Sequence, residues 1–179
     1  MRQPYWPMAI IDFEASGLGI GTYPIEVGVA LWPSAEDRAT VWSTLIRPAP
    51  EWVRDGDWHE AGQKIHGISP HDLEHGMDPV DVMAHLNAML QDVGVVHCDG
   101  GKHDAHWMTT LRIAAGVPAR FVLGSISAII RHSTPDQWEA YEAWQKAHPV
   151  PHRAGPDAEN IMSGIASAAG LAPPTFVRT

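Results

Sequence analysis

A pair of acidic residues inside an apolar segment is the feature of this sequence that most limits how the chain can fold. Residues 9–19 read Ala-Ile-Ile-Asp-Phe-Glu-Ala-Ser-Gly-Leu-Gly, and an apolar run of β-formers that ends in a glycine-containing turn is typical of a buried strand. Side chains alternate along a strand, so Asp12 and Glu14 point to one face. Ile11 and Phe13 then point to the opposite face, toward a core.

This acidic pair needs a compensating charge if the strand is buried. Two neighbouring carboxylates in a buried position repel each other and lose hydration. No Lys or Arg occurs between Arg2 and Arg38 to offset them. A divalent cation would do so, because Mg²⁺ and Mn²⁺ prefer hard oxygen ligands. On this pair alone, the alternative of two side chains on a solvated sheet face stays open.

The length and composition predict one globular domain over residues 1–179, with 45% hydrophobic and 18% charged residues. No apolar run approaches the ~20 residues needed to span a bilayer, and residues 1–7 lack the apolar core of a signal peptide. Cys98 is the single cysteine, which excludes an intramolecular disulfide. We therefore expect a cytoplasmic protein that does not associate with membranes.

The formal net charge of −9 restricts the kind of nucleic acid that the protein can bind. Tight, non-specific binding of long duplexes normally requires a basic surface. A phosphate-bearing substrate is not excluded, because bound divalent cations would add positive charge where the acidic residues cluster.

Five apolar segments predict the strands of one sheet, and the segments between them predict its topology. Strands are expected at residues 8–14, 25–32, 40–48, 93–98 and 120–124. Short connections between the first three strands favour an antiparallel meander. Helices are expected at residues 79–90, 104–115, 127–131, 136–148 and 157–169. A strand that follows a connecting helix is parallel to the first strand, so the order predicts an α/β domain with a mixed sheet flanked by helices.

Three residues far from the acidic pair have side chains suited to the same chemistry. Asp104 opens a predicted helix just after the fourth strand, His152 lies in a proline-flanked loop, and Asp157 opens the last predicted helix. Each has an ordinary alternative, because an Asp at a helix start is commonly a cap and a loop His is commonly just solvated.

Taken together, Asp12-x-Glu14, Asp104 and His152-x-x-x-x-Asp157 resemble the DEDDh family of 3′–5′ exonucleases, which includes polymerase proofreading subunits and RNase T. Residues 12–17 match the first motif of the family, and residues 152–157 match the third. The segments 25–28 (Ile-Glu-Val-Gly) and 66–68 (His-Gly-Ile) also resemble family segments. The resemblance covers nearly the whole chain in order. It implies an RNase H-like sheet of five strands, three antiparallel and then two parallel.

The resemblance also implies a mechanism with two divalent cations, Mg²⁺ or Mn²⁺. Asp12, Glu14 and Asp157 would ligate one ion, and Asp12 with Asp104 would hold the second. Such a pair of ions, ~4 Å apart, can position an attacking water and stabilise the leaving 3′-oxygen. His152 would accept the proton from that water, since a histidine with a pKa near ~6.5 suits a general base at neutral pH.

By the same resemblance, the substrate is single-stranded or short RNA or DNA with a free 3′ end. The groups expected to meet the terminal nucleotide are Ala15, Ser16 and Gly17, with Leu18 as a wedge against its base and His66 beside it. The products would be nucleoside monophosphates. A homodimer is compatible with the resemblance, because several family members form one.

The second motif departs from the family pattern, which has an Asn four residues before its Asp and an aromatic residue directly before it. Gly100 and His103 occupy those positions here. Asp104 is the expected metal ligand, but Asp99 is close enough to compete for that role or to be a turn residue.

Three alternatives to an exonuclease stay in view. A non-catalytic nucleic-acid-binding module on the same fold would be expected to have lost acidic ligands. A phosphoesterase of small phosphoesters, with His and Asp ligands, would need several His near the acidic cluster. A transition-metal site at His103 and His106, with the nearby His97 and Cys98, has weak support, since no second half with Cys or His at zinc spacing is present.

Overall fold

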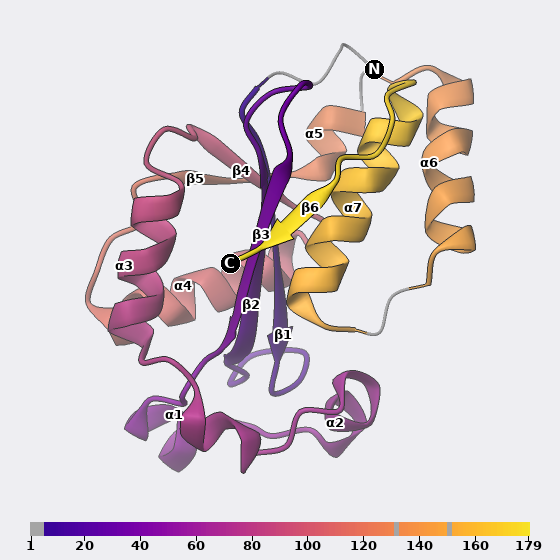
Figure 1. Cartoon of the computed structure of the whole chain (residues 1–179). Helices are drawn as coiled ribbons and strands as arrows, with labels where there is room; N and C mark the ends of the chain where they lie inside the picture. The colour runs from indigo at the N-terminus through magenta and orange to yellow at the C-terminus, as the bar shows by residue number, and fades with distance from the viewer. Residues whose placement is uncertain (1–5, 131–132, 150–151) are drawn as a thin grey trace.

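A mixed sheet runs through the centre of the molecule, with helices against both of its faces (Figure 1). The computed structural model describes residues 6–130, 133–149 and 152–179. Its strands are β1 (Met8–Ala15), β2 (Pro24–Trp32), β3 (Ala39–Leu45), β4 (Val95–Cys98), β5 (Val122–Ser125) and β6 (Phe176–Arg178). Its helices are α1 (Pro50–Asp55), α2 (Glu60–His66), α3 (Pro79–Met89), α4 (Lys102–Ala115), α5 (Ile126–Ile130), α6 (Pro135–Ala147) and α7 (Ala154–Ala168), with a 3₁₀ helix, η1, at Asp72–His75.

The strand order is β5-β4-β1-β2-β3-β6. Strands β1, β2 and β3 pair antiparallel, whereas β4 is parallel to β1 and β5 is parallel to β4. The predicted arrangement of three antiparallel strands followed by two parallel ones is therefore confirmed. A sixth strand, β6, was not predicted, and it adds three residues in parallel to β3 at the edge of the sheet.

The two faces of β1 belong to two different cores. Ile11 and Phe13 belong to the larger core, between the sheet and helices α3 and α4. Met8 and Ile10 belong to the second core, between the sheet and α7. Since side chains alternate, Asp12 and Glu14 continue the α7 face of the strand. That face is apolar where β1 begins and acidic where it ends.

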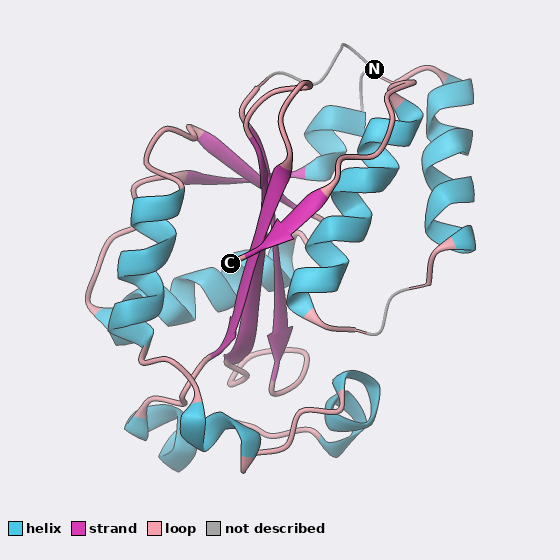
Figure 2. Cartoon of the chain, viewed as in Figure 1, coloured by secondary structure: helices cyan, strands magenta, loops and turns pink. Residues whose placement is uncertain are grey.

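Figure 2 shows how the helices divide between the faces, with α3 and α4 on one side of the sheet and α5, α6 and α7 on the other. Helix α7 packs directly on β1 and β2, and α6 packs on α7. Helices α1 and α2 lie beyond the end of the sheet where β1 runs into its turn with β2 (Figure 1). The carboxyl end of β1 is therefore bordered by α7 and α2.

Several predicted boundaries differ from the structure. The third strand was expected at residues 40–48 but ends at Leu45. The last helix was expected to open at Asp157 but begins three residues earlier, at Ala154, so that Asp157 lies in its first turn. Arg131, the expected end of the helix at 127–131, lies outside the described residues.

Residues 49–64, for which the sequence predicted no helix or strand, contain α1 and most of α2. Both helices are short and have few buried residues, so their apolar pattern is weak. Across residues 6–130, 133–149 and 152–179, no helix has the length and apolar character needed to cross a membrane.

Candidate active site

Two parallel strands bring the predicted acidic residues to one edge of the sheet. Glu14 lies at the end of β1, and Asp99 follows the last residue of the neighbouring β4. The carboxyl ends of parallel strands meet at the same edge, so segments about 85 residues apart in sequence converge there. Asp104 is in the first turn of α4, which starts three residues after Asp99.

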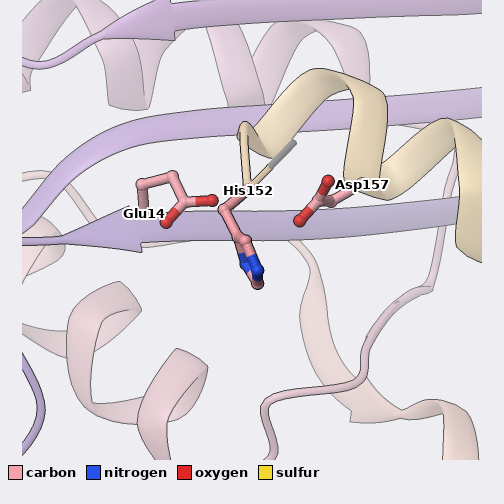
Figure 3. A group of neighbouring side chains, drawn as sticks. All are labelled: Glu14, His152 and Asp157. Atoms are coloured by element: carbon pink, nitrogen blue, oxygen red, sulfur yellow. The ribbon is translucent and has the colours of Figure 1, made fainter. Parts of the chain in front are cut away.

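Glu14, His152 and Asp157 form the first group of side chains at this edge. One ligand atom from each residue lies within 4.8 Å of the others. Figure 3 shows the Glu14 side chain on β1 facing the Asp157 carboxylate at the start of α7, with His152 beside them. His152 has a positive φ of 52°, a conformation that few non-glycine residues adopt and that is found disproportionately at functional sites.

Asp12, Asp99 and Asp104 form the second group, also within 4.8 Å of one another. Asp12 and Asp104 are buried, while Asp99 is exposed. The Gly100 amide donates a hydrogen bond of 2.9 Å to Asp104 Oδ2. A side chain at position 100 would clash with Asp104, since an added Cβ would lie 2.7 Å from its carboxylate oxygens. Glycine at this position therefore lets the loop fold closely over Asp104.

Burial and mutual repulsion make these carboxylates unusually weak acids. Burial, followed by the charge of Asp104, raises the pKa of Asp12 well above 3.8. Burial, followed by the charge of Asp157, raises the pKa of Glu14 from 4.5 to about 8. Burial also raises the pKa values of Asp104 and Asp157 to about 6. Without cations, this cluster would hold protons near neutral pH.

The donor set fits divalent cations such as Mg²⁺ or Mn²⁺. All candidate ligands other than His152 are carboxylates, which are the oxygen donors that these ions prefer. The Oδ1 atom of Asp157 is buried and accepts no hydrogen bond from the described residues. Buried carboxylate oxygens are normally paired, so this oxygen has the free lone pairs that a metal ion requires.

A pocket of about 300 Å³ opens beside Glu14 and His152. It is lined by residues from the end of β1, the turn after it, α2 and the residue before it, α4, and the segment before α7: Phe13, Glu14, Ala15, Gly17, Leu18, His59, Ala61, Gly62, Ile65, His66, Trp107 and His152. Leu18 is two-thirds exposed at the rim, whereas His66 is buried with its Nδ1 accepting a hydrogen bond from the Ile68 amide.

Of the five residues expected to meet substrate, Ala15, Gly17, Leu18 and His66 line this pocket and Ser16 does not. Ser16 is fully buried. Its amide donates to the Tyr23 carbonyl, its carbonyl accepts from the His59 amide, and its Oγ accepts from the Tyr23 amide. All of these groups are therefore used to close the turn.

His59 and Trp107 line the pocket but were not among the predicted site residues. His59 directly precedes α2 and lies against Gly17, where an added Cβ would overlap its ring. Trp107 comes from α4 and donates from Nε1 to Thr22 Oγ1 at 3.1 Å, which fixes the β1–β2 turn. Helix α2 ends at Gly67, which has a left-handed φ of 72°. A glycine in this position is the feature of the sequence that could have indicated the helix.

The alternative transition-metal site at His97, His103 and His106 is not formed in the part of the chain that the structure describes. His97 is buried in β4. The His106 ring shares a hydrogen bond of 3.2 Å with the Thr22 carbonyl, and His103 lies next to the ring of Trp107. His106 and Trp107 thus hold the same turn.

No protein-family model matches the sequence, and no curated protein matches it. Solved structures match in fold. E. coli Exonuclease I in complex with a dA16 oligonucleotide has a TM-score of 0.63 and 13% identity, over 90% of this chain and 41% of that chain. The zinc ion bound form of the E. coli Exonuclease I–single-stranded DNA complex has a TM-score of 0.64 and 13% identity, over 90% and 40%.

A third match is a 3′-exonuclease in a structure of 3′-end specific recognition of a histone mRNA stem-loop. Its TM-score is 0.61 at 15% identity, over 92% of this chain and 66% of that chain. The protein described here spans about two fifths of the length of Exonuclease I. The chain therefore has the RNase H-like exonuclease fold. This is the fold that the sequence resemblance predicted, and the likeness extends over about nine tenths of the chain.

Proposed function

We propose that this protein is a metal-dependent 3′–5′ exonuclease that releases nucleoside monophosphates from single-stranded or short nucleic acid. The observation that carries the proposal is the convergence of Asp12, Glu14, Asp104, His152 and Asp157 at one edge of the sheet, beside a pocket. These residues come from three distant parts of the sequence. An RNase H-like exonuclease fold supports the same activity, and Exonuclease I is crystallised with single-stranded DNA.

Two divalent cations, Mg²⁺ or Mn²⁺, would be held by the carboxylates. Glu14 and Asp157 would bind one ion, Asp104 would bind the other, and Asp12 would contact both, because its pKa is raised by the charges of residues in both groups. Asp99 is a further candidate ligand for the ion at Asp104. Bound ions would activate water and stabilise the leaving oxygen.

His152 would act as the general base. Its ring lies within 4.8 Å of ligand atoms of Glu14 and Asp157, and its side chain is exposed at the mouth of the pocket. A proton acceptor must lie within hydrogen-bond reach of the water that it deprotonates. The position of His152 between the carboxylates and the pocket supports this role.

The terminal nucleotide would occupy the pocket of about 300 Å³. Ala15 and Gly17 would contact it through backbone, His66 and His59 would lie beside it, and Leu18 would press against a base from the rim. An apolar contact with the face of a base, such as that of Leu18, does not depend on which base is present. The single domain over 1–179, a cytoplasmic location and a homodimer remain predictions from the sequence.

The non-catalytic alternative is less well supported, because a binding module has no need for a set of buried carboxylates with raised pKa values. Perturbed pKa values of this kind cluster at catalytic sites. The small-phosphoester alternative requires several His ligands, whereas His152 is the one His in the candidate metal groups of the described residues.

The proposal is tested with 5′-labelled RNA and DNA oligomers, incubated with Mn²⁺ or with EDTA. We expect a ladder that shortens from the 3′ end, with nucleoside monophosphates as products. The ladder should be absent in EDTA and with Asp12→Ala, and present with Asp81→Ala, a matched control at an exposed site on α3. Metal-dependent cleavage of bis(p-nitrophenyl) phosphate without strand shortening would instead support the small-phosphoester alternative.

A further inference from the structure

Glu26 is a buried carboxylate in the sheet that the proposed mechanism does not use. It lies on β2 directly opposite Glu14 on β1, and only 3% of its surface is exposed. Opposite residues of an antiparallel pair point to the same face. Glu26 therefore faces α7, next to the acidic cluster.

The partners of Glu26 are the two residues at the start of α7. Arg153 binds its carboxylate with two hydrogen bonds, of 2.9 Å from Nε to Oε2 and 2.7 Å from Nη2 to Oε1. The Ala154 amide donates a third, of 3.0 Å, to Oε2. Arg153 is the residue before the first turn of the helix and has no capping side chain of its own. Glu26 therefore satisfies an amide of the first turn from a neighbouring strand.

The backbones of β2 and α7 are also in close contact at this point. A Cβ added to Gly28 would overlap the carbonyl of Ala154, so glycine is required there for the helix to approach the strand. A Cβ added to Gly155 would lie 2.9 Å from Ser43 Oγ on β3. The start of α7 thus packs closely on the sheet, and Glu26 on β2 is hydrogen-bonded to it at this point.

Both functional residues of this segment are tied directly to Arg153. His152 precedes it in the chain, and the Asp157 amide donates a hydrogen bond of 2.9 Å to the Arg153 carbonyl. Any displacement of Arg153 therefore moves both side chains relative to Glu14. Only the Glu26 side of this ion pair is buried, since 42% of the Arg153 side chain is exposed. Ion pairs, buried or exposed, commonly contribute little net stability, so the role of this pair is better explained by the positioning of its neighbours.

We propose that Glu26 is a positioning residue: its ion pair with Arg153 and its hydrogen bond to Ala154 hold His152 and Asp157 against Glu14. This role rests on the proposed function for its effect on turnover, but the clamp itself is a property of the fold. Residues that orient metal ligands without touching the metal commonly change affinity or activity by ~10–100-fold when they are mutated.

The test compares Glu26→Gln and Arg153→Lys with the wild-type chain. Gln keeps the size of the side chain but cannot accept both hydrogen bonds from the guanidinium. Lys keeps the charge but not the paired geometry. The matched control is Glu159→Gln on α7, which removes the same charge from an ion pair of 2.7 Å with Arg178 on β6.

We expect hydrogen exchange at residues 152–158 to become ~10-fold faster or more in Glu26→Gln, with the other protected segments unchanged. Mn²⁺ affinity, measured by calorimetry, should fall ~10-fold, and kcat should fall ~10–100-fold with KM within about threefold. Arg153→Lys should give smaller changes in the same direction, and Glu159→Gln should match the wild type in exchange at 152–158, in Mn²⁺ affinity and in kcat.

Unchanged exchange at residues 152–158 in Glu26→Gln, or faster exchange spread evenly over the chain, would overturn the proposal. If Glu26→Gln does not fold, the same readouts on Arg153→Lys decide. If the wild-type chain shows no exonuclease activity, the proposed function fails, whereas hydrogen exchange and Mn²⁺ binding still test the clamp.

Discussion

Replacing Glu14 by Gln should stabilise the metal-free protein at high pH while reducing the stabilisation that the protein gains from metal. Burial and the neighbouring Asp157 raise the pKa of Glu14 from 4.5 to about 8. A carboxyl group whose pKa is raised on folding contributes stability below its unfolded value, and this contribution is lost as the pH rises through the folded value. The loss therefore extends from about pH 4.5 to about pH 8.

The size of the effect follows from the same pKa values. A change from 4.5 to about 8 corresponds to up to about 5 kcal/mol, at about 1.4 kcal/mol for each tenfold change in acidity. Gln has a similar shape and does not ionise. In EDTA at pH 9 the variant should therefore be more stable than the wild type by several kcal/mol, and at pH 5 the two should differ by less than about 1 kcal/mol.

Urea unfolding at the two pH values, in EDTA, measures this difference. Adding Mn²⁺ at pH 9 to 100 times its Kd should stabilise the wild type by about 2.7 kcal/mol for each ion bound, which is about 5–11 °C in Tm per ion for a chain of this length. The variant should gain much less. A Glu14→Gln protein that is no more stable than the wild type at pH 9 would refute the reasoning, because Glu14 would then carry no cost of ionisation.

Three further variants test separate parts of the site. His152→Gln should lower kcat ~100-fold or more while leaving Mn²⁺ affinity, measured by calorimetry, within a few-fold, since general-base catalysis commonly contributes ~10²–10⁴-fold; an equal loss of Mn²⁺ affinity would make His152 a ligand instead. Trp107→Phe removes the hydrogen bond to Thr22 and should lower the free energy of unfolding in urea by about 1 kcal/mol. The KM for oligomers should rise; an unchanged KM would show that the β1–β2 turn does not affect substrate binding. Gly28→Ala should destabilise the fold by about 2 kcal/mol or more because its Cβ would overlap the Ala154 carbonyl, and a neutral result would show that α7 can move away from β2.

The strands at the centre of the sheet were predictable because their residues carry a local signal. β1 and β2 are apolar runs bounded by Gly or Pro, and their observed ends lie within one residue of those expected. β6 carries no such signal. It has three residues, Phe176–Arg178, and it forms by pairing with β3, more than 130 residues earlier in the chain.

The acidic residues of the candidate site were expected from their resemblance to family motifs, whereas their surroundings depend on long-range packing. The contact between Glu26 and Arg153 joins residues 127 apart, so nothing near either residue in the sequence indicates it. The proximity of Asp99 to Asp12 depends on the parallel pairing of β4 with β1, which lie more than 80 residues apart in the sequence. His59, directly before α2, and Trp107, in α4, line the pocket. Helix α2 was not predicted from the sequence.

The central claim, that the buried carboxylates form a site for two metal ions, is tested most directly by anomalous diffraction from crystals soaked in Mn²⁺. We expect two anomalous peaks, one at Glu14 and Asp157 and the other at Asp104, with Asp12 beside both. The second peak should also show whether Asp99 is a ligand. Peaks only at surface sites, or no peak within coordination distance of Asp12 at saturating Mn²⁺, would contradict the account.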